Sequence, residues 1–409
     1  MNTHTPKKID FKTMFMFAAL FVLAGYLYDL ARALLTSDFY DFGHYYIYAR
    51  LMGEGFRLWE ITPELIARFN MLAREAGIKA PLELVHSTGF LYFVYPFSFL
   101  PYKISLVIWV IINQVALLLS VFVLLKDKLK LEPLLFWGGV FLAFSLWGLR
   151  EDLYLGQPNA LLLLFISLAY FNIRKGHYIQ AGIFLGLAVQ IKEIFLPLLL
   201  FFIIRRYWKG LLSAIVVVAI PKSVYTLCFG FGNEVSYWNH IWPKLYTLCD
   251  PWDKVNLSIY SIFAKVLLPF AKPELARLLF FIFSLLFLIY ITITLIKRFY
   301  PEKPNEPLLL AGLVALCFVI SPWVHETHYV ILIFPLIISW LHLGCFFSRS
   351  SFVLFGASYF LIALKYSFAR YSLFFTGPLY IFAAGKTYGY ILLFILICQL
   401  LKKVKHASG

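Results

Sequence analysis

The chain has 409 residues, of which 62% are hydrophobic and only 14% are charged, and its mean hydropathy is +0.81. This composition excludes a water-soluble domain, and the repeated apolar runs of about 20 residues are typical of membrane-spanning helices. The net charge of +15 therefore indicates cytoplasmic loops, contact with anionic headgroups and an anionic substrate, rather than nucleic-acid binding.

The first part of the chain predicts one span followed by a long loop. Lysines precede the apolar run at about Met14–Leu35, and because cytoplasmic segments are rich in Lys and Arg, the N-terminus should be cytoplasmic. Residues 36–103 then form a first outer-face loop. It contains an amphipathic helix at about Pro63–Ala76 and a Pro-bounded aromatic run at 90–101, which is too short to span and is interpreted as interfacial or re-entrant. The second span, about Ile104–Leu125, returns the chain to the cytoplasm.

The later apolar runs alternate in direction, and Lys and Arg mark their cytoplasmic ends. Residues 230–272 are interpreted as a second outer-face loop with a helix at about Asn256–Phe270. We expect about twelve spans with both termini in the cytoplasm. After the first two, the expected spans lie at about Pro133–Leu149, Gly156–Ile173, Tyr178–Ile191, Ile194–Ile204, Leu211–Phe229, Leu275–Ile296, Leu308–Ile320, His328–Phe347, Ser351–Leu364 and Thr376–Leu401. The fold class is therefore an all-α integral membrane protein, a polytopic helical bundle with interfacial helices on its outer face. It forms a single domain over residues 1–409 in the cell (inner) membrane.

Polar residues gather at the predicted outer ends of these spans, whereas the cytoplasmic ends carry little beyond Lys and Arg. Ionisable groups at bilayer depth are costly and usually functional or paired. A transporter or flippase of a lipid-linked glycan, which is the alternative function, needs polar groups near the bilayer midplane. The pattern instead favours an enzyme whose site faces the outer side. The residues concerned are Asp38, Asp41, Arg150, Glu151, Asp152, Gln157, Asn159, Lys192, Glu193, His325, Glu326, His328, Lys365 and Arg370.

The acidic stretch Asp38–Ala49 has two interpretations. In one, Ser37 or Asp38 caps the next helix and Asp41 complements the helix dipole. In the other, a carboxylate at this position is a general base that deprotonates an acceptor hydroxyl attacking a sugar. A lipid phosphate leaving group would then be held by Lys, Arg or His, and aromatic rings would stack on sugar faces.

Several short motifs resemble the polyprenol-phosphate-mannose-dependent mannosyltransferases of glycosyltransferase family 87, within the GT-C class of integral-membrane glycosyltransferases. Each motif is weak alone, but together they follow the family's order from about residue 41 to 345. They are Asp41-Phe-x-x-Tyr45, Gly55-Phe-Arg-Leu-Trp59, Tyr95-Pro96, Gly156-Gln-Pro-Asn159, Lys192, Asn256-x-Ser258, and Ser321-Pro322 followed by His328-Tyr329.

The resemblance implies a GT-C-type fold and a membrane glycosyltransferase. The donor would be a polyprenyl-phosphate-linked sugar, with mannose as the expected sugar, and the acceptor a glycan or glycolipid on the extracytoplasmic face. The family also includes enzymes for arabinofuranosyl donors, so the sugar stays open. Transfer would invert the sugar carbon without a metal or another cofactor.

The resemblance also implies roles for individual residues. Asp41 would be the general base, and Lys192 and His328 would hold the donor phosphate. The simpler alternatives are that Lys192 pairs with Glu193 or reaches the interface, and that His328 only begins a helix. The residues expected to support the site or contact the acceptor are Asp38, Tyr45, Gln157, Asn159, His325 and Glu326.

Overall fold

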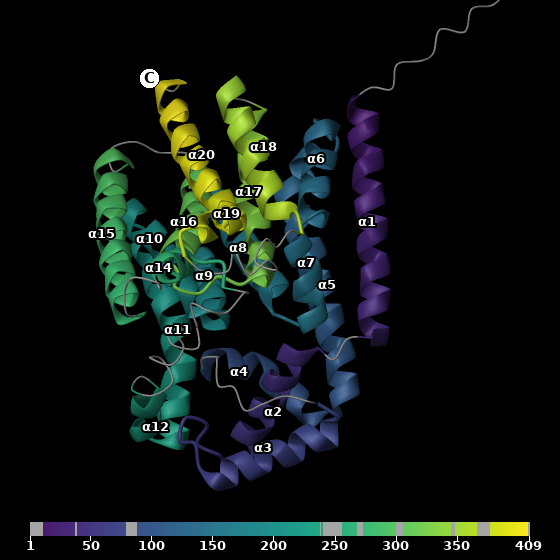
Figure 1. Cartoon of the computed structure of the whole chain (residues 1–409), viewed down its shortest axis with the longest axis vertical. Coiled ribbons are helices and arrows are strands. Elements are labelled where there is room, and N and C mark those ends of the chain that lie inside the picture. The colour runs from purple at the N-terminus through teal and green to yellow at the C-terminus, as the bar shows by residue number, and fades with distance from the viewer. Residues whose placement is uncertain are drawn as a thin grey trace, which may run out of the picture.

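The computed structural model describes residues 11–36, 39–78, 88–237, 239, 256–267, 273–299, 306–344, 348–365 and 377–407. Within these ranges the chain is mostly helical and contains no β-strand, which confirms the all-α class (Figure 1). The α-helices are α1 (Phe11–Thr36), α2 (Tyr40–Gly53), α3 (Pro63–Ala76), α4 (Thr88–Val94), α5 (Tyr102–Leu125), α6 (Pro133–Phe144), α7 (Trp147–Leu155), α8 (Asn159–Arg174), α9 (Tyr178–Ile191), α10 (Leu200–Arg205), α11 (Trp208–Phe229), α12 (Phe231–Ser236), α14 (Ile259–Leu267), α15 (Pro273–Phe299), α16 (Glu306–Ile320), α17 (Ile333–Leu343), α18 (Arg349–Ala363), α19 (Tyr380–Ala383) and α20 (Gly385–Ala407). The 3-10 helices are η1 (Tyr95–Phe99), η2 (Lys126–Lys128), η3 (Glu193–Leu199) and η5 (Glu326–Leu332).

Among the described residues, five helical segments are long and apolar enough to cross a membrane: Phe11–Leu35, Tyr102–Lys128, Trp208–Phe229, Glu326–Leu343 and Gly385–Lys403. Helices α6 and α7 together form a sixth candidate with a 50° bend, and this bent pair covers the span that the sequence predicted at about Pro133–Leu149. Further apolar helices of 10–17 residues accompany them. The chain is thus a polytopic membrane protein, and the total of about twelve spans stays a prediction.

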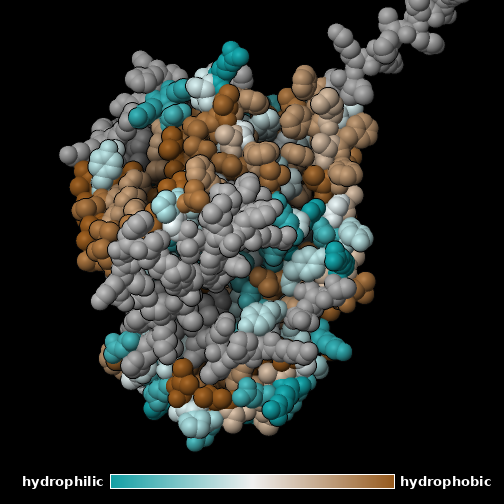
Figure 2. Space-filling view, in the orientation of Figure 1, coloured by the Kyte–Doolittle hydropathy of each residue, from teal (hydrophilic) through white to brown (hydrophobic). Residues whose placement is uncertain are grey.

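The outer surface of the bundle is apolar. Phe21 of α1 and Leu227 of α11 are 80% and 85% exposed, as expected for side chains that face lipid. Hydrophobic side chains cover much of the upper part of the face shown in Figure 2, and hydrophilic ones gather at its lower end. Inside the bundle, every residue from Leu308 to Val319 of α16 is buried, so this helix lies in the core.

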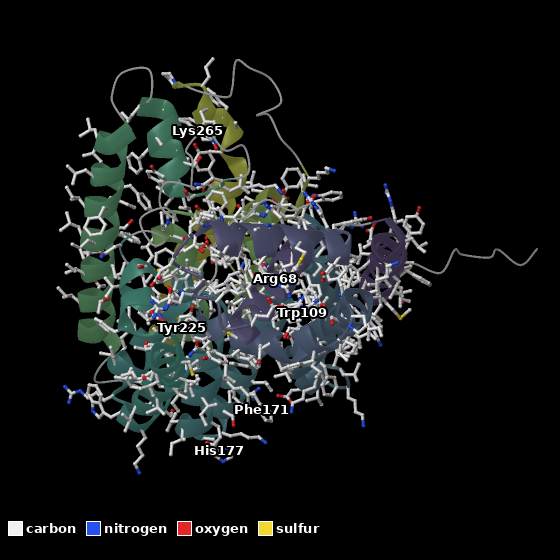
Figure 3. The ribbon with its side chains drawn as sticks, turned by 90° about the horizontal axis from the view of Figure 1, so that it is seen from below. Arg68, Trp109, Phe171, His177, Tyr225 and Lys265 are labelled. Carbon is white, nitrogen blue, oxygen red and sulfur yellow. The ribbon has the colours of Figure 1, made fainter. Side chains whose placement is uncertain are left out.

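Helices α2, α3, α4 and α12 lie at the end of the bundle opposite the start of α1 and the end of α20 (Figure 1). Figure 3 views the molecule from that end, with Arg68 of α3 near the middle. The predicted loop at 36–103 contributes most of this layer. The termini of the described chain thus share one end of the bundle, in agreement with an even number of crossings; which face of the membrane each end occupies stays a prediction.

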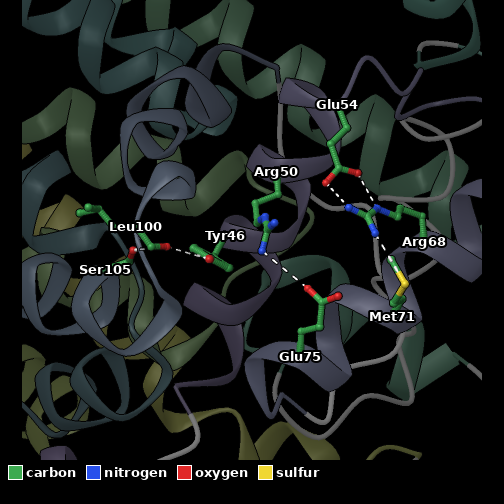
Figure 4. A network of polar contacts seen from close by, with 8 residues as sticks. All are labelled: Tyr46, Arg50, Glu54, Arg68, Met71, Glu75, Leu100 and Ser105. Atoms are coloured by element: carbon green, nitrogen blue, oxygen red, sulfur yellow. Dashed lines mark hydrogen bonds and ion pairs between the residues drawn. The ribbon is translucent and has the colours of Figure 1, made fainter.

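Helix α3 has the bounds that the sequence predicted, and it covers α2. Thr62 caps it by accepting a hydrogen bond from the Leu65 amide at 3.2 Å, and its apolar side is buried. Its polar side is joined to α2 by two ion pairs (Figure 4). Arg68 donates to both carboxylate oxygens of Glu54, at 2.6 and 2.5 Å, and Arg50 lies 3.8 Å from Glu75. These contacts hold α2, the helix that carries the acidic motif.

The bend between α6 and α7 brings α7 against η5. A Cβ atom added at Gly148 would lie 2.4 Å from the Glu326 carbonyl oxygen, so only glycine allows this approach. Helix α7 ends at Gly156, whose φ of +71° is the left-handed conformation common after a helix. The turn that follows carries Gln157 and Asn159.

Candidate active site

Asp41 occupies the first turn of α2, where a negative charge is stabilised by the helix dipole. The N-cap of α2 is Phe39, which makes no side-chain capping bond and has a φ of 42°. A left-handed conformation at a bulky residue costs about 1–3 kcal/mol and is held here by complete burial of the ring. Ser37 and Asp38, the residues predicted to cap this helix, lie outside the described residues. Their capping role and the role of Asp38 in the site stay predictions.

One amide joins Asp41 to Lys192. Gln157 Nε2 donates to Asp41 Oδ2 at 2.6 Å, and Lys192 Nζ donates to Gln157 Oε1 at 3.0 Å. Three residues that are 116 and 35 positions apart in sequence thus form one chain of hydrogen bonds. The Gln157 amide thus links the Asp41 carboxylate to the Lys192 ammonium, and the two charged groups do not contact each other directly.

The position of Gln157 depends on the turn at Gly156. The Gly156 carbonyl accepts a hydrogen bond from Trp109 Nε1 of α5 at 2.8 Å. A Cβ atom added at Gly156 would lie 2.9 Å from the Cβ of Phe42, the residue that follows Asp41. The turn therefore packs closely against the side chains at the start of α2, where Gln157 and Asp41 are in hydrogen-bond contact.

A second polar pair lies beside the first. Asn159 Nδ2 donates to Asp152 Oδ1 at 2.6 Å and to the Thr327 carbonyl oxygen at 3.1 Å. Asp152 is 4% exposed and Asn159 is fully buried. Asn159 thus joins α7 to the start of η5. The role that the sequence predicted for it, to support the site or contact the acceptor, stays a prediction.

Lys192 lies at the junction of α9 and η3, within electrostatic range of the carboxylates of Asp152 and Asp41. Desolvation lowers the pKa of its amine to about 8, against the attraction of Asp152 and Asp41, which favours the charged form. Its sequence neighbour Glu193 does not neutralise it, because Glu193 pairs with Lys222 Nζ at 2.5 Å and accepts from Tyr237 Oη at 3.2 Å. The structure thus disagrees with the simple pairing of Lys192 and Glu193.

Tyr45, one turn after Asp41 on α2, is 1% exposed. Burial raises the pKa of its phenol well above the usual value, and the charges of Asp41 and Asp152 raise it further. Tyr45 therefore keeps its proton and lies within electrostatic reach of both carboxylates, which agrees with a supporting role.

The two predicted histidines form the turn that begins η5. The His325 ring accepts a hydrogen bond at Nδ1 from the Thr327 amide at 3.2 Å, and the His325 amide donates to His328 Nδ1 at 3.4 Å. Burial lowers the pKa of His325 to about 4, and the charges of Lys192 and Lys386 act in the same direction. The charge of Lys192 thus acts on His325, and the role of His328 in holding the donor phosphate stays a prediction.

Glu326, expected to support the site, forms an ion pair with Lys386 at the start of α20. Sequence reasoning missed Lys386, although a lysine inside the predicted span Thr376–Leu401 is itself a signal of function. It named Asp152 among the polar residues at the outer ends of the spans and gave it no role in the site. Burial, which the sequence does not show, distinguishes Asp152 from its neighbours.

Two further predicted motifs meet in space. Asn256 Nδ2 and Ser258 Oγ both donate to the Pro322 carbonyl oxygen, at 3.2 and 2.9 Å. The Asn256 side chain also accepts from the Ser258 amide at 3.0 Å. These residues fasten the segment before α14 to the segment before η5, so their role here is to hold the backbone of the site.

Comparison with known proteins assigns the chain to a family. The model of glycosyltransferase family 87 matches residues 85–322, which is more than half of the chain. The matched range contains Gln157, Asn159 and Lys192, and it ends before His325 and His328; Asp41 precedes it. No curated protein matches the chain. Family membership favours an enzyme over the transporter alternative: the chain belongs to glycosyltransferase family 87 and is a membrane glycosyltransferase.

Proposed function

We propose that the enzyme transfers mannose from a polyprenyl-phosphate-linked donor to a glycan or glycolipid acceptor on the extracytoplasmic face of the membrane. Transfer inverts the sugar carbon and uses Asp41 as general base, without a metal. The observation that carries this proposal is the bridge from Asp41 through Gln157 to Lys192. It supplies a base and a cation side by side at the end of the bundle.

Each end of the bridge matches one half of the reaction. Asp41 takes the proton of the acceptor hydroxyl as that oxygen forms its bond to the anomeric carbon. The bond from this carbon to the phosphate oxygen breaks, and its electron pair remains on the phosphate. Lys192 then stabilises the negative charge of the leaving phosphate.

The two hydrogen bonds of 2.6 and 3.0 Å, with one amide between them, keep the Asp41 carboxylate within about 8 Å of the Lys192 ammonium. The proposed base and the proposed phosphate ligand are therefore close enough to act on one donor sugar.

The choice of donor and face rests on independent arguments. Mannose and the polyprenyl phosphate follow from the resemblance of the motifs, and a lipid donor suits a site at the edge of an apolar bundle. The extracytoplasmic face follows from the Lys and Arg that mark the opposite ends of the predicted spans.

Asp41→Asn tests the proposal. Radiolabelled mannose transfer from polyprenyl-phosphate-mannose to acceptors in native membranes is compared between wild type and variant, with and without a chelator. We expect the loss of a general base to lower the rate by about 10²- to 10⁴-fold, and chelation to leave the wild-type rate unchanged. Asparagine keeps the size and polarity of the side chain, so folding should survive.

Asp152→Asn is the matched control within the same site. Its hydrogen bond from Asn159 has a carbonyl oxygen to accept it in either residue, but the variant loses the negative charge that favours the charged form of Lys192. We therefore expect a smaller loss than in Asp41→Asn. A wild-type rate in Asp41→Asn, or a loss in Asp152→Asn as large as that in Asp41→Asn, contradicts the assignment of the base. Transfer that a chelator stops contradicts the metal-independent mechanism.

A further inference from the structure

A buried ion pair lies next to the proposed reaction site and is not used by the mechanism. Lys386, at the start of α20, pairs with Glu326, at the start of η5, and their side chains are 4% and 23% exposed. The Lys386 ammonium also lies 5.8 Å from the centre of the Tyr329 ring. A buried ion pair of this kind often adds little stability, because desolvation of the two charges offsets their attraction. Its presence here therefore calls for a functional explanation.

The ion pair adjoins the histidine turn. The charges of Lys192, at the end of α9, and of Lys386, at the start of α20, both act on the His325 ring. His325 itself is neutral at pH 7, because burial lowers its pKa to about 4. Since its Nδ1 accepts the Thr327 amide, its proton resides on Nε2. The turn thus offers one neutral N–H donor within electrostatic range of two ammonium groups.

Two ammonium groups and an N–H donor suit a phosphate. The leaving group in the proposed reaction gains negative charge as the sugar departs, and one lysine bridged to Gln157 offsets only part of it. Glu326 is itself an oxyanion, and it occupies Lys386 in the structure described here. A second carboxylate within electrostatic reach of Lys386, that of Glu151, is held by Trp147 Nε1 at 2.8 Å.

We propose that Lys386 is a second ligand of the donor phosphate, and that Glu326 is an internal anion which holds Lys386 until the phosphate replaces it. This inference rests on the proposed polyprenyl-phosphate donor and deepens it. In the empty site Glu326 keeps the buried ammonium neutralised. When the phosphate binds, its oxygens take over this role and Glu326 turns toward the partly exposed side of the turn.

Binding of undecaprenyl phosphate, which carries no sugar, tests the inference on the purified full-length protein in nanodiscs. Undecaprenol, which lacks the phosphate, measures the contribution of the lipid chain alone. We expect Lys386→Met to weaken binding of the phosphate lipid by about 10- to 100-fold, as for loss of a hydrogen bond to a charged group. Lys386→Arg keeps the charge and should bind within a few-fold of wild type. Glu326→Gln should bind more tightly than wild type, because a neutral amide no longer competes with the phosphate.

A matched pair elsewhere in the chain controls for structural effects. Arg205 and Glu306 form an ion pair of similar burial, 8% and 20% exposed, at a face that the sequence assigns to the cytoplasm. Arg205→Met should therefore leave undecaprenyl phosphate binding unchanged.

The opposite directions expected for Lys386→Met and Glu326→Gln separate the inference from a structural ion pair. Weaker binding in both variants, or wild-type affinity in Lys386→Met, overturns it. Should Lys386→Met fail to fold, Glu326→Gln alone decides, since unchanged or weaker binding contradicts the exchange of anions. A wild-type protein that binds no undecaprenyl phosphate contradicts the proposed donor as well, and binding that is unaffected by Lys386→Met contradicts the role of Lys386 alone.

Discussion

Gln157→Leu removes the bridge between Asp41, the proposed base, and Lys192 while nearly keeping the volume of the side chain. Both hydrogen bonds of the amide are lost, the one to Asp41 at 2.6 Å and the one from Lys192 at 3.0 Å. Nothing then holds the carboxylate and the ammonium apart. We expect the two to approach each other, which stabilises the carboxylate in its charged form and makes it a weaker base.

The magnitude follows from the lost hydrogen bond between Gln157 Nε2 and the Asp41 carboxylate. A hydrogen bond to a charged group contributes about 1.5–3 kcal/mol. A loss of about 2 kcal/mol of transition-state stabilisation corresponds to a fall of about 30-fold in kcat/KM.

The assay is initial-rate mannose transfer in native membranes at several donor concentrations, so that kcat and KM are separated. Gln114→Leu is the matched control, because Gln114 also accepts one hydrogen bond, from Tyr26 Oη at 2.6 Å, and lies outside the site. The control should transfer at close to the wild-type rate. Equal losses in the two variants would mean that any lost glutamine contact slows the enzyme, and a wild-type rate in Gln157→Leu would refute the bridge.

The Lys192 ammonium is charged below its pKa of about 8, so kcat/KM for the donor should fall as the pH rises through that value. Lys192→Arg stays charged, and its profile should remain flat to at least pH 10 or so. Gly156→Ala combines the strain of a left-handed residue with a contact of 2.9 Å to Phe42, so we expect a lower Tm and slower transfer. Gly176→Ala has the same backbone strain, with a φ of +74° and nothing within 4 Å, so it should lower Tm less and leave transfer unchanged. Arg68→Met removes an ion pair whose side chains are more than a quarter exposed, so thermal unfolding should shift by no more than about 1 kcal/mol and transfer should persist.

Much of the fold was predictable, because a chain of this composition can cross a bilayer only as apolar helices that satisfy their own backbone hydrogen bonds. Apolar runs give the spanning helices, and the capping and amphipathic pattern of α3 gives its bounds. The bend between α6 and α7 was not predictable, since it depends on Gly148 packing against a backbone carbonyl from a distant segment. Hydropathy reports how much apolar surface a segment carries, and not what it packs against.

The candidate site was predictable in part for the same reason. Alternating spans put Asp41, Gln157 and Lys192 at one level, and the structure joins them by hydrogen bonds. The partner of each residue was less accessible, because it depends on side-chain direction and burial. Lys192 thus contacts Gln157 instead of adjacent Glu193, which turns to Lys222.

Helix α7 has nine residues, and glycines without room for a side chain lie at its two ends. One end is pressed against η5 and the other against α2, so this helix acts as a spacer of fixed length. Inserting or deleting a single residue in α7 would rotate the segment that follows the helix by about 100° and shift it by about 1.5 Å along the helix axis. Gln157 would then point away from Asp41. We therefore expect relatives of this enzyme to vary the outward-facing side chains of α7 freely while keeping its length unchanged.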